Sequence, residues 1–457
     1  MNNRAKILTA LSIISLPMIG SIQAQQSPNV IIIFCDDMGY GDLSCFGSPS
    51  THTPYIDQMC AEGQKWSCFY DSASVSSPSR GGLLTGQFGV RSGLYGDERN
   101  VLFPGYVGGI NNQQHTTIAT YLSKAGYTTA CVGKWHLGDK VGQMPLDNGF
   151  EYYFGIPYSN DMVASRNGLP PLPLYNQREV VETEPDQRLF TQRFTDYTID
   201  IIDKSQLEGN PFFIYLAHPM PHVPIFASDQ FKGSSERGLY GDVIEELDYN
   251  IGRILQHLRD KGLAENTIVV LSSDNGPWVI KKLNGGSNGS LRDGKASAFE
   301  GGFRAPTLFW GYGVESGTQK SCMGSTLDLL PTLCEMASVE LPTDVIFDGE
   351  SLTKVLSGEK ESSERDTYYF YRGSEIHAIR KGNFKLHVKC NQLKWFAVDI
   401  IPEEELNNLP WLYNVGEDPG ERYNIADKHP EIVAELLQLI KDREEEVVPV
   451  DAIFDIK

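Results

Sequence analysis

The chain has 457 residues and a mass of 50.9 kDa, and 40% of its residues are hydrophobic while 21% are charged. This is the composition of a folded globular protein, and it excludes a disordered or fibrous one. Thirty-nine basic and 59 acidic residues give a formal net charge of −20. That balance argues against a nucleic-acid-binding protein, which needs a basic surface.

The first 24 residues have the pattern of a signal peptide. Arg4 and Lys6 form a short positive segment, residues 7–22 are mainly apolar, and Ala24 ends the segment. Polar residues, a proline and a glycine interrupt the apolar run, so it is too short and too polar for a stable membrane anchor. We therefore predict a signal peptide over residues 1–24 and a mature protein that is periplasmic or secreted, without a membrane anchor.

The eight cysteines are widely spread, and no two of them form a Cys-x-x-Cys pair. They do not have the density of a disulfide scaffold, although an oxidising compartment permits disulfides. The sequence does not predict which cysteines pair.

Short apolar runs alternate with helix-like stretches through most of the chain. Residues 30–34, 128–132, 212–216 and 268–271 are apolar on both faces, as buried strands of a mainly parallel sheet are. Residues 116–125, 187–205 and 241–261 have helical spacing, and Gly126 and Gly262 follow the first and the last of these. The alternation of strand and helix predicts an α/β fold.

A change of pattern near residue 345 predicts a boundary, after a helix at 325–336 and a turn at 342–344. Beyond it we predict strands at 367–372, 378–381, 384–388 and 411–415 and a helix at 431–442. The organisation expected is a large domain over residues 25–345 and a smaller α+β subdomain with an antiparallel sheet over residues 346–457.

Each of the four buried strands in the first domain is followed by polar residues. These are Asp36 with Asp37, residues 134–136, residues 218–222, and Asp274 with Asn275. In an open α/β sheet ligands bind beyond the carboxyl ends of the strands, so the clusters are expected to meet there. Strand ends are also commonly just solvated, and any single cluster has that simpler explanation.

Oxygen donors dominate two of these clusters. Asp36, Asp37, Asp274 and Asn275 suit Ca²⁺, with Mg²⁺ as the alternative, and disfavour zinc, which usually recruits His or Cys. Asp-Asp and Asp-Asn-Gly also occur as ordinary turns. The position of both pairs after apolar strands favours the metal site.

The stretch SSPSRGGLLTG at 76–86 is the most informative in the chain. A helix starting near Pro78 places Ser76 at a positive helix terminus, where free N–H groups attract an anion, and Arg80 on the same face. A serine-capped helix with a surface arginine is the alternative.

This stretch resembles the signature of the formylglycine-dependent sulfatases, in which the first position is Cys or Ser and is converted to formylglycine. Residues 36–42, 133–138, 155–159, 218–224, 273–276, 291–295 and 300–302 follow in sulfatase order. Residues 155–159 and 291–295 are similar to the group that contains arylsulfatase A and N-acetylgalactosamine-6-sulfatase.

The resemblance implies an alkaline-phosphatase-like fold, with a large mostly parallel sheet flanked by helices and a smaller C-terminal sheet. It implies calcium ligation by Asp36, Asp37, Asp274 and Asn275, with modified Ser76 facing the ion. The catalytic residues implied are Ser76, Arg80, Lys134, His136, His222 and Lys295, with Ser159 in the sulfate pocket. In these roles the cations hold the sulfate oxygens, His222 or Lys295 protonates the leaving oxygen, and His136 is a base.

A serine at the first signature position implies a radical maturation enzyme of the serine type as a partner. The substrate implied is a sulfated glycan, with sulfated galactose or N-acetylgalactosamine as the expected sugar. Asn160, Asp161 and Arg166 follow the matched Ser159 and are candidate sugar contacts, or part of an ordinary loop. A phosphoesterase or phosphonate monoester hydrolase of the same superfamily, and a glycan-binding protein with unmodified Ser76, are the alternatives.

Overall fold

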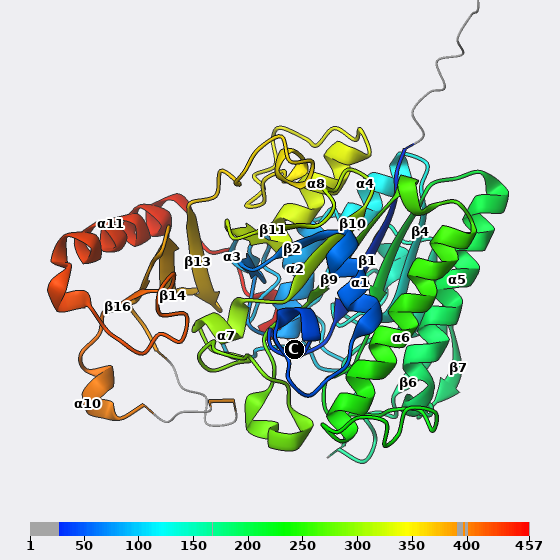
Figure 1. The fold of residues 1–457 in the computed structure, drawn as a ribbon, viewed down its shortest axis with the longest axis horizontal. Coiled ribbons are helices and arrows are strands. Elements are labelled where there is room, and N and C mark those ends of the chain that lie inside the picture. The colour runs from blue at the N-terminus through cyan, green and yellow to red at the C-terminus, as the bar shows by residue number, and fades with distance from the viewer. Residues whose placement is uncertain (1–26, 167, 391–395, 398–400, 457) are drawn as a thin grey trace, which may run out of the picture.

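A computed structural model describes residues 27–456, apart from residues 167, 391–395 and 398–400. The predicted signal peptide lies outside the described residues. Figure 1 shows a large sheet with helices on both faces and, to one side, a smaller sheet that packs against a long helix. This arrangement confirms the predicted α/β fold with a second, smaller sheet.

The large sheet is built from strands that come from the first three quarters of the chain. Its strands are β1 (Asn29–Cys35), β2 (Gln64–Trp66), β4 (Thr128–Lys134), β5 (Tyr152–Ile156), β6 (Pro173–Asn176), β7 (Glu179–Thr183), β8 (Phe212–Ala217), β9 (Thr267–Ser273), β10 (Thr307–Gly311) and β11 (Thr318–Lys320). In the described part of the chain they form one ten-stranded sheet, in the order β11-β2-β10-β9-β1-β8-β4-β5-β6-β7.

The centre of this sheet, from β9 through β1, β8 and β4 to β5, is parallel, as predicted. The antiparallel pairings lie toward the edges, between β10 and β9, β10 and β2, β5 and β6, and β6 and β7. The four predicted strands are β1, β4, β8 and β9. The other strands were not predicted, because most of them are short or lack the continuous apolar run of a central strand.

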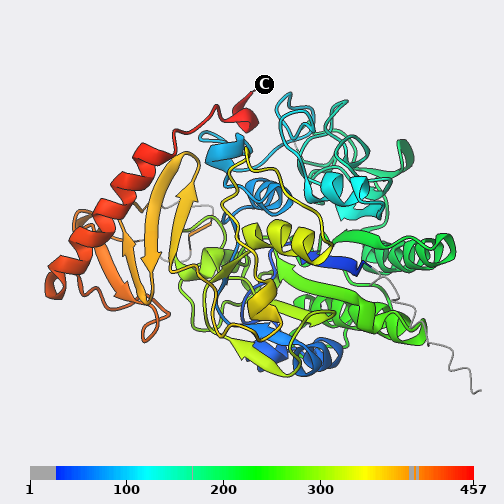
Figure 2. The ribbon, with the colours of Figure 1, turned by 90° about the horizontal axis from the view of Figure 1, so that it is seen from above.

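Helices cover both faces of the large sheet. The helices of the chain are α1 (Pro54–Glu62), α2 (Ser76–Thr85), α3 (Gly89–Ser92), α4 (Ile118–Lys124), α5 (Phe190–Glu208), α6 (Leu239–Asp260), α7 (Glu300–Phe303), α8 (Leu329–Met336), α9 (Thr353–Leu356), α10 (Glu403–Leu406) and α11 (Pro430–Glu446). Helices α5 and α6 lie side by side on one face (Figures 1 and 2). Residues of α2, α4 and α8 pack on the other face.

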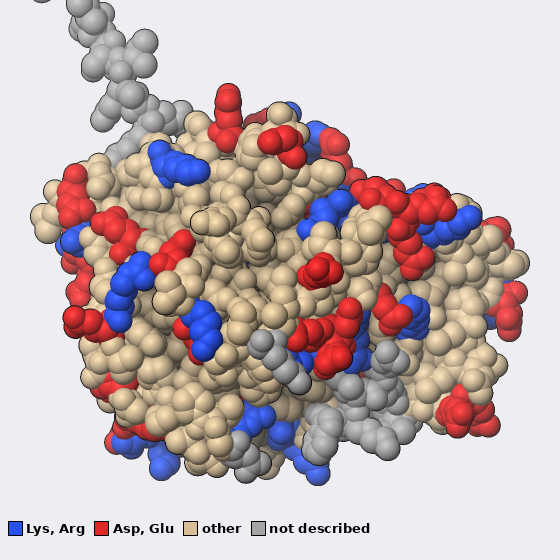
Figure 3. Space-filling model, turned by 180° about the vertical axis from the view of Figure 1, so that it is seen from behind, with Lys and Arg blue, Asp and Glu red and all other residues tan. Residues whose placement is uncertain are grey.

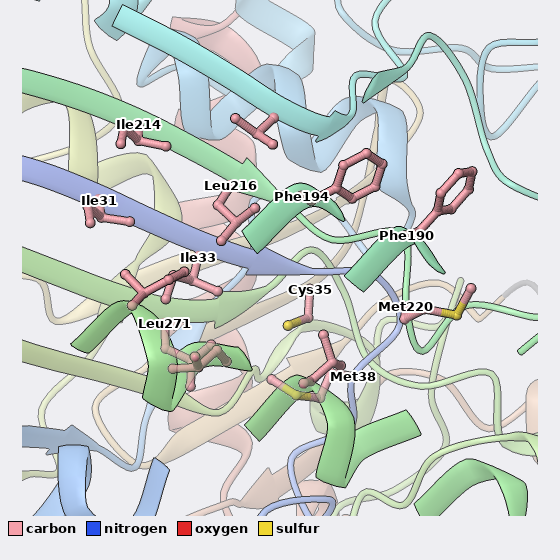
Figure 4. Packing of buried hydrophobic residues seen from close by; sticks show 14 of the residues in the cluster. Ile31, Ile33, Cys35, Met38, Phe190, Phe194, Ile214, Leu216, Met220 and Leu271 are labelled. Carbon is pink, nitrogen blue, oxygen red and sulfur yellow. The ribbon is translucent and has the colours of Figure 1, made fainter. Parts of the chain in front are cut away.

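The alternation of side chains along β1 explains why both faces must be covered. Ile31 and Ile33 belong to the same buried cluster as Phe190 and Phe194 of α5 (Figure 4). Ile32, on the opposite face, packs in the layer of α4 and α8. Strands buried on both faces in this way read as continuous apolar runs.

The helix predicted at 325–336 begins later than expected. Residues 324–325 form β12 (Gly324–Ser325), which pairs with β3 (Phe69–Tyr70), and a 3-10 turn, Thr326–Asp328, precedes α8. The Ser325 side chain accepts the N–H of Leu327, and Asp328 accepts the N–H of Ser325. This reciprocal cap fixes the turn and delays the start of the α-helix.

The smaller sheet contains β13 (Thr367–Arg372), β14 (Glu375–Lys381), β15 (Phe384–His387) and β16 (Trp411–Asn414), all antiparallel to their neighbours. Helix α11 covers its outer face (Figure 2). Leu352 and Leu356, and later Phe454, pack in the core of the large sheet. The division at residues 345–346 stays a prediction.

Candidate active site

The carboxyl ends of neighbouring parallel strands bring the predicted ligands together. Cys35 at the end of β1 pairs with Ser273 at the end of β9, so Asp36–Asp37 and Asp274–Asn275 leave the sheet side by side. Strand β8 lies between β1 and β4, and β4 ends at Lys134. The clusters that follow the strands therefore meet at one edge of the sheet.

The acidic groups are tied to one another directly. Asp37 donates its backbone N–H to Asp274 Oδ1 at 3.2 Å, and Asn275 Nδ2 donates to Asp37 Oδ1 at 2.7 Å. Asp37 has a φ of 62°, a conformation that is uncommon outside glycine and that clusters at functional sites.

Each of the three carboxylates is paired with its own cation. The contacts are Lys134 Nζ to Asp36 Oδ2 at 2.5 Å, Lys295 Nζ to Asp37 Oδ1 at 2.7 Å, and Arg80 Nη2 to Asp274 Oδ2 at 2.8 Å. All six side chains are buried. We call these six residues the site cluster; its three negative and three positive charges balance, so a bound divalent cation would give it a net positive charge that favours an anion.

The two adjacent aspartates differ in how well their charge is compensated. Burial raises a carboxyl pKa, but Lys134 and Arg80 outweigh burial at Asp36 and hold its pKa below the ordinary value. At Asp37, burial together with Asp36 and Asp274 raises the pKa to about 7, although Lys295 opposes the rise. A further cation beside such a carboxylate would stabilise its ionised form.

The donor set fits a hard divalent cation. Asn275 Oδ1 is buried and has no hydrogen-bond partner among the described residues. Ligand atoms of Asp36, Asp37 and His222 lie within 4.8 Å of one another, and Asp274 is joined to this group through Asp37. An orphaned amide oxygen beside buried carboxylates is the arrangement expected for Ca²⁺ or Mg²⁺.

Ser76 lies at the start of α2 and contacts the site cluster. Its Oγ donates to Asp36 Oδ1 at 3.0 Å and lies 3.3 Å from Lys134 Nζ. Val75, not Ser76, is the N-cap residue, and Arg80 is fully buried. The alternative of a serine-capped helix with a surface arginine is therefore wrong.

Close packing fixes the position of α2. A Cβ added at Gly82 would lie 2.1 Å from Ser72 Oγ, so this turn of the helix has no room for a side chain. Gly86 ends the helix in the left-handed region with a φ of 67°. These glycines of the signature thus serve the placement of Ser76 and Arg80.

His136 presents one ring nitrogen without a partner. Its Nε2 lies 3.0 Å from the carbonyl oxygen of Leu102, which can only accept, so Nε2 carries the proton. The lone pair of Nδ1 is then unused, since Nδ1 has no hydrogen-bond partner in the described part of the chain. Burial and the nearby charges of Lys134 and Arg80 hold the pKa of His136 well below its ordinary value.

His222 is oriented by a residue expected to contact the sugar. Its Nδ1 lies 3.1 Å from Asn160 Oδ1, and its Nε2 lies 3.7 Å from Asp37 Oδ2. Asn160 is fully buried, and its Nδ2 donates to Gln187 Oε1 at 3.1 Å. Burial and, to a smaller extent, the positive charge of Lys295 hold the pKa of His222 well below its ordinary value. Asn160 therefore contacts the imidazole of His222. Gln187, which holds Asn160, was not predicted as a site residue.

These groups face a cavity of about 290 Å³. The predicted residues on its wall are Ser76, His136, Ser159, Asp161, Arg166, His222 and Lys295. Ser159 Oγ lies 3.4 Å from Lys134 Nζ, and Arg166 forms an ion pair with Asp161.

Aromatic residues complete the wall. Trp278 and Phe396 stack with ring centroids 5.0 Å apart, and Lys295 Nζ lies 5.1 Å from the Trp278 ring centroid. Sequence reasoning missed both aromatic residues. The position of Trp278 soon after the Asp274–Asn275 pair was an available signal, whereas Phe396 comes from a distant segment.

The charges on the outer surface have a different arrangement. Figure 3 shows Lys and Arg side chains scattered among Asp and Glu side chains on the face drawn there. The cations of the site cluster are buried instead. The positive charge available to an anionic ligand is therefore local to the cavity.

Comparison with known proteins identifies the family. The family model described as Sulfatase matches residues 28–339, and the model described as the C-terminal region of aryl-sulfatase matches residues 363–456. The chain belongs to the sulfatase family. As a member of it, the chain is a sulfuric ester hydrolase with the alkaline-phosphatase-like fold.

Similar sulfatases cover nearly the whole chain. N-acetylgalactosamine-6-sulfatase of Mus musculus is 35% identical, over 97% of this chain and 91% of that protein. Arylsulfatase A of Bos taurus is 36% identical, over 96% of this chain and 91% of that protein. The crystal structure of the PsFucS1 sulfatase from Pseudoalteromonas sp. superposes with a TM-score of 0.82 at 25% identity, covering 93% of this chain and 92% of that one.

In the described part of the chain, none of the helices has the length and apolarity that crossing a membrane requires.

Proposed function

We propose that this sulfatase removes a sulfate ester from a galactose or N-acetylgalactosamine residue of a glycan, with formylglycine made from Ser76 and a bound Ca²⁺ ion. The observation that carries the proposal is the position of Ser76. Its hydroxyl lies at the head of α2, on the cavity wall, in contact with Asp36 and Lys134.

Two groups supply chemistry that the unmodified side chains lack. Calcium held by Asp36, Asp37, Asp274 and Asn275 would polarise the sulfate and stabilise negative charge beside it. Hydrated formylglycine would supply an attacking hydroxyl and a second hydroxyl whose deprotonation releases sulfate. The convergence of buried oxygen donors on Ser76 supports both.

The cations of the site cluster bind the sulfate oxygens in this proposal. Arg80, Lys134 and Lys295 are buried, so their charges act in a medium that screens them little. Because their positions are fixed by Asp274, Asp36 and Asp37, they require little reorganisation during reaction.

The resting protonation states assign the proton transfers. Burial lowers the pKa of Lys295, but Asp37, Asp36 and Asp274 outweigh burial and raise it, so Lys295 carries a proton. His222, with its lowered pKa, is neutral at rest. We therefore assign protonation of the leaving oxygen to Lys295, with His222 beside it, and proton acceptance to His136 Nδ1.

The sugar preference rests on the relatives and on the cavity. The mouse relative is named for a sulfated N-acetylgalactosamine. Asp161 and Arg166 line the cavity beyond Ser159, where the sugar that carries the sulfate would lie. We assign both to substrate binding.

Maturation and export complete the proposal. A serine at position 76 requires a radical maturation enzyme of the serine type, which oxidises the hydroxymethyl group to an aldehyde. The segment over residues 1–24, outside the described residues, would direct the protein to the periplasm or the exterior.

Mass spectrometry tests the formylglycine directly. The tryptic peptide of residues 66–80, from protein made in its native host, should be two hydrogens lighter than the unmodified sequence. Ser76→Ala should fold normally and lose activity on an aryl sulfate by at least about 10⁴-fold, because the nucleophile is absent. An intact serine in active native material, or sulfate release by the alanine variant, would overturn the mechanism.

A further inference from the structure

Two cysteines outside the active site are brought together by a short turn and a helix. Cys45 lies in the 3-10 turn Ser44–Phe46, and Cys60 lies in α1. The carboxylate of Asp57 in α1 accepts the backbone N–H of Cys45 at 2.9 Å and the Ser44 hydroxyl at 2.8 Å. Cys60 follows Asp57 by three positions and so shares its face of the helix. The Asp57 contacts thus hold the turn against the face that carries Cys60.

The two thiols, both free in this structure, are neighbours that interact. The Cys45 thiol donates a hydrogen bond to the sulfur of Cys60. Both side chains pack against the same core layer of the large sheet, and both are partly exposed. The fold therefore places the two thiols beside each other, where a reagent from solution can reach them.

A positive charge beside the pair favours the reactive thiolate. Lys65 Nζ donates to the carbonyl oxygen of Cys45 at 2.6 Å. The hydrogen bond from Cys45 and the charge of Lys65 lower the pKa of Cys60 to about 7, against the effect of burial. Thiolate is the nucleophile in disulfide exchange, so Cys60 is the sulfur that attacks first.

We propose that Cys45 and Cys60 form a disulfide bond in the exported protein. The Cys60 thiolate attacks one sulfur of a donor disulfide, carried by a thiol–disulfide oxidoreductase or by glutathione disulfide, and displaces one donor thiolate. Cys45 then loses its proton and attacks the Cys60 sulfur, which releases the second donor thiolate. The cysteine pair gives up two electrons and two protons, and the donor disulfide becomes two thiols.

The bond would fasten the segment that follows the Asp36–Asp37 pair. Asp42, between that pair and Cys45, accepts the Tyr240 hydroxyl at 2.6 Å and the backbone N–H of Ser287 at 2.8 Å. Thr51 donates to the carbonyl oxygen of Asp42 at 2.6 Å. A covalent link from Cys45 to α1 would close this loop in the unfolded chain as well, which stabilises the fold.

Peptide mapping tests the bond without reference to catalysis. Trypsin together with a protease that cleaves before aspartate yields residues 42–56 and 57–65, each with one cysteine. Protein from the native host is alkylated in denaturant without reductant and then digested. We expect the two peptides as one linked species, two hydrogens lighter than their sum, that separates on reduction; alkylation of both cysteines before reduction would overturn the proposal.

A stability measurement provides the matched control. A reductant should lower the Tm of the wild type by about 3 °C, as expected for a short closed loop in a chain of this size. It should leave the Tm of Cys45→Ala and Cys60→Ala unchanged, and aryl sulfate turnover by both variants should stay within twofold of wild type. An equal shift in the variants would assign the effect to other cysteines and contradict the proposal. Loss of the linked peptide with retained activity would leave the sulfatase assignment intact, so the two failures are distinguishable.

Discussion

The structure contains two largely buried groups of ionised side chains that differ in how completely the polar atoms around them are hydrogen-bonded. One is the site cluster. The other, which we call the Glu300 cluster, joins the large and small sheets and consists of Glu300, Glu421, Arg304, Arg380 and Lys385. Glu300 accepts the Tyr70 hydroxyl at 2.8 Å and Lys385 Nζ at 2.9 Å.

Glu421 is paired as fully as Glu300. It accepts His387 Nε2 at 2.6 Å and the backbone N–H of Glu300 at 2.6 Å. Burial raises the pKa of Glu300, but Lys385, Arg380 and Arg304 outweigh burial and lower it to about 2. Both carboxylates of this cluster are thus ion-paired and hydrogen-bonded within the protein.

Two residues beside the site cluster instead have polar atoms without a partner in the described part of the chain. Asn275 Oδ1 and His136 Nδ1 are buried without a partner among the described residues, and the cluster borders a cavity of about 290 Å³. An unsatisfied buried group lowers stability, so it calls for an explanation that a saturated group does not. Paired charges alone therefore do not mark an active site; unused polar atoms beside a cavity do.

The response to a metal ion should be the largest difference between the two clusters. Asp274→Asn keeps an acceptor for Arg80 but removes one negative charge from the proposed calcium site. We expect activity to fall by at least about 10³-fold, as when a group that positions the catalytic charges is lost. In the wild type, saturating calcium at about 100 times its Kd should add about 2.7 kcal/mol of stability, and the variant should lose most of this gain.

Activity on an aryl sulfate and melting curves with calcium or chelator measure both effects. Glu421→Gln, in the Glu300 cluster, is the matched control and should keep the calcium response of the wild type. A calcium response that is unchanged in Asp274→Asn would exclude Asp274 from the metal site.

Neutralising the Glu300 cluster should affect stability more than catalysis. Glu300→Gln keeps the shape of the side chain but leaves Lys385, Arg380 and Arg304 without their shared counter-charge. Removing one partner from a buried ionic group costs about 3–5 kcal/mol. Urea denaturation should show that loss, while the folded variant keeps activity within about tenfold of wild type.

An exposed ion pair serves as the control for Glu300→Gln. Lys381 Nζ lies 2.6 Å from Glu435 Oε1 at the surface of the small sheet and α11. Glu435→Gln should cost far less stability than Glu300→Gln, because water already solvates both charges. Equal losses in the two variants would show that the Glu300 cluster does not hold the sheets together through its buried charge.

A buried acid outside both clusters shows the cost of a carboxylate that has no cation. Asp248 in α6 accepts the backbone N–H groups of Tyr55 and Ile56 at the start of α1. Burial raises its pKa to about 7 despite these hydrogen bonds. Its stabilising contribution is therefore complete below the unfolded pKa of about 3.9 and is lost as the pH rises through 7.

Asp248→Asn should remove that dependence. Between pH 5 and pH 8 the wild type should lose about 2 kcal/mol of unfolding free energy relative to the variant, because the asparagine has no charge to desolvate. Urea denaturation of both proteins at the two pH values measures the difference. Parallel pH curves would show that Asp248 ionises in the fold as easily as in the unfolded chain.

The sequence predicted the centre of the large sheet because burial on both faces leaves a plain signal. Strand β1 is apolar at successive positions, and so are β8 and β9. Polar residues follow these strands abruptly, which is why Asp36 and Asp274 could be placed at one edge before any coordinates. The small sheet could also be predicted, from its sequential hairpins.

Contacts between distant loops left no such signal. Asn160 and Gln187 are 27 positions apart in the sequence, and nothing in the residues around Asn160 indicates His222 as its neighbour. Glu300 was noticed as part of a motif, but its partners Arg380 and Lys385 come from the small sheet. Side-chain pairing across separate elements depends on the tertiary fold, which periodicity does not describe.

The contact between Asn160 and His222 gives the finest test of the comparison, because it acts within the site without carrying charge. Asn160 Oδ1 can only accept, so it fixes the proton of His222 on Nδ1 and leaves Nε2 facing Asp37 and the cavity. Asn160→Ala removes this restraint, and we expect kcat on an aryl sulfate to fall about tenfold to 100-fold with little change in KM. Gln187→Ala, which removes the support behind Asn160, should have a smaller effect of the same kind. A rise in KM without a fall in kcat would instead place Asn160 among the substrate contacts. A kcat effect that Gln187→Ala reproduces in part, at unchanged Tm, would establish that the site depends on the orientation of a neutral imidazole as well as on its buried charges.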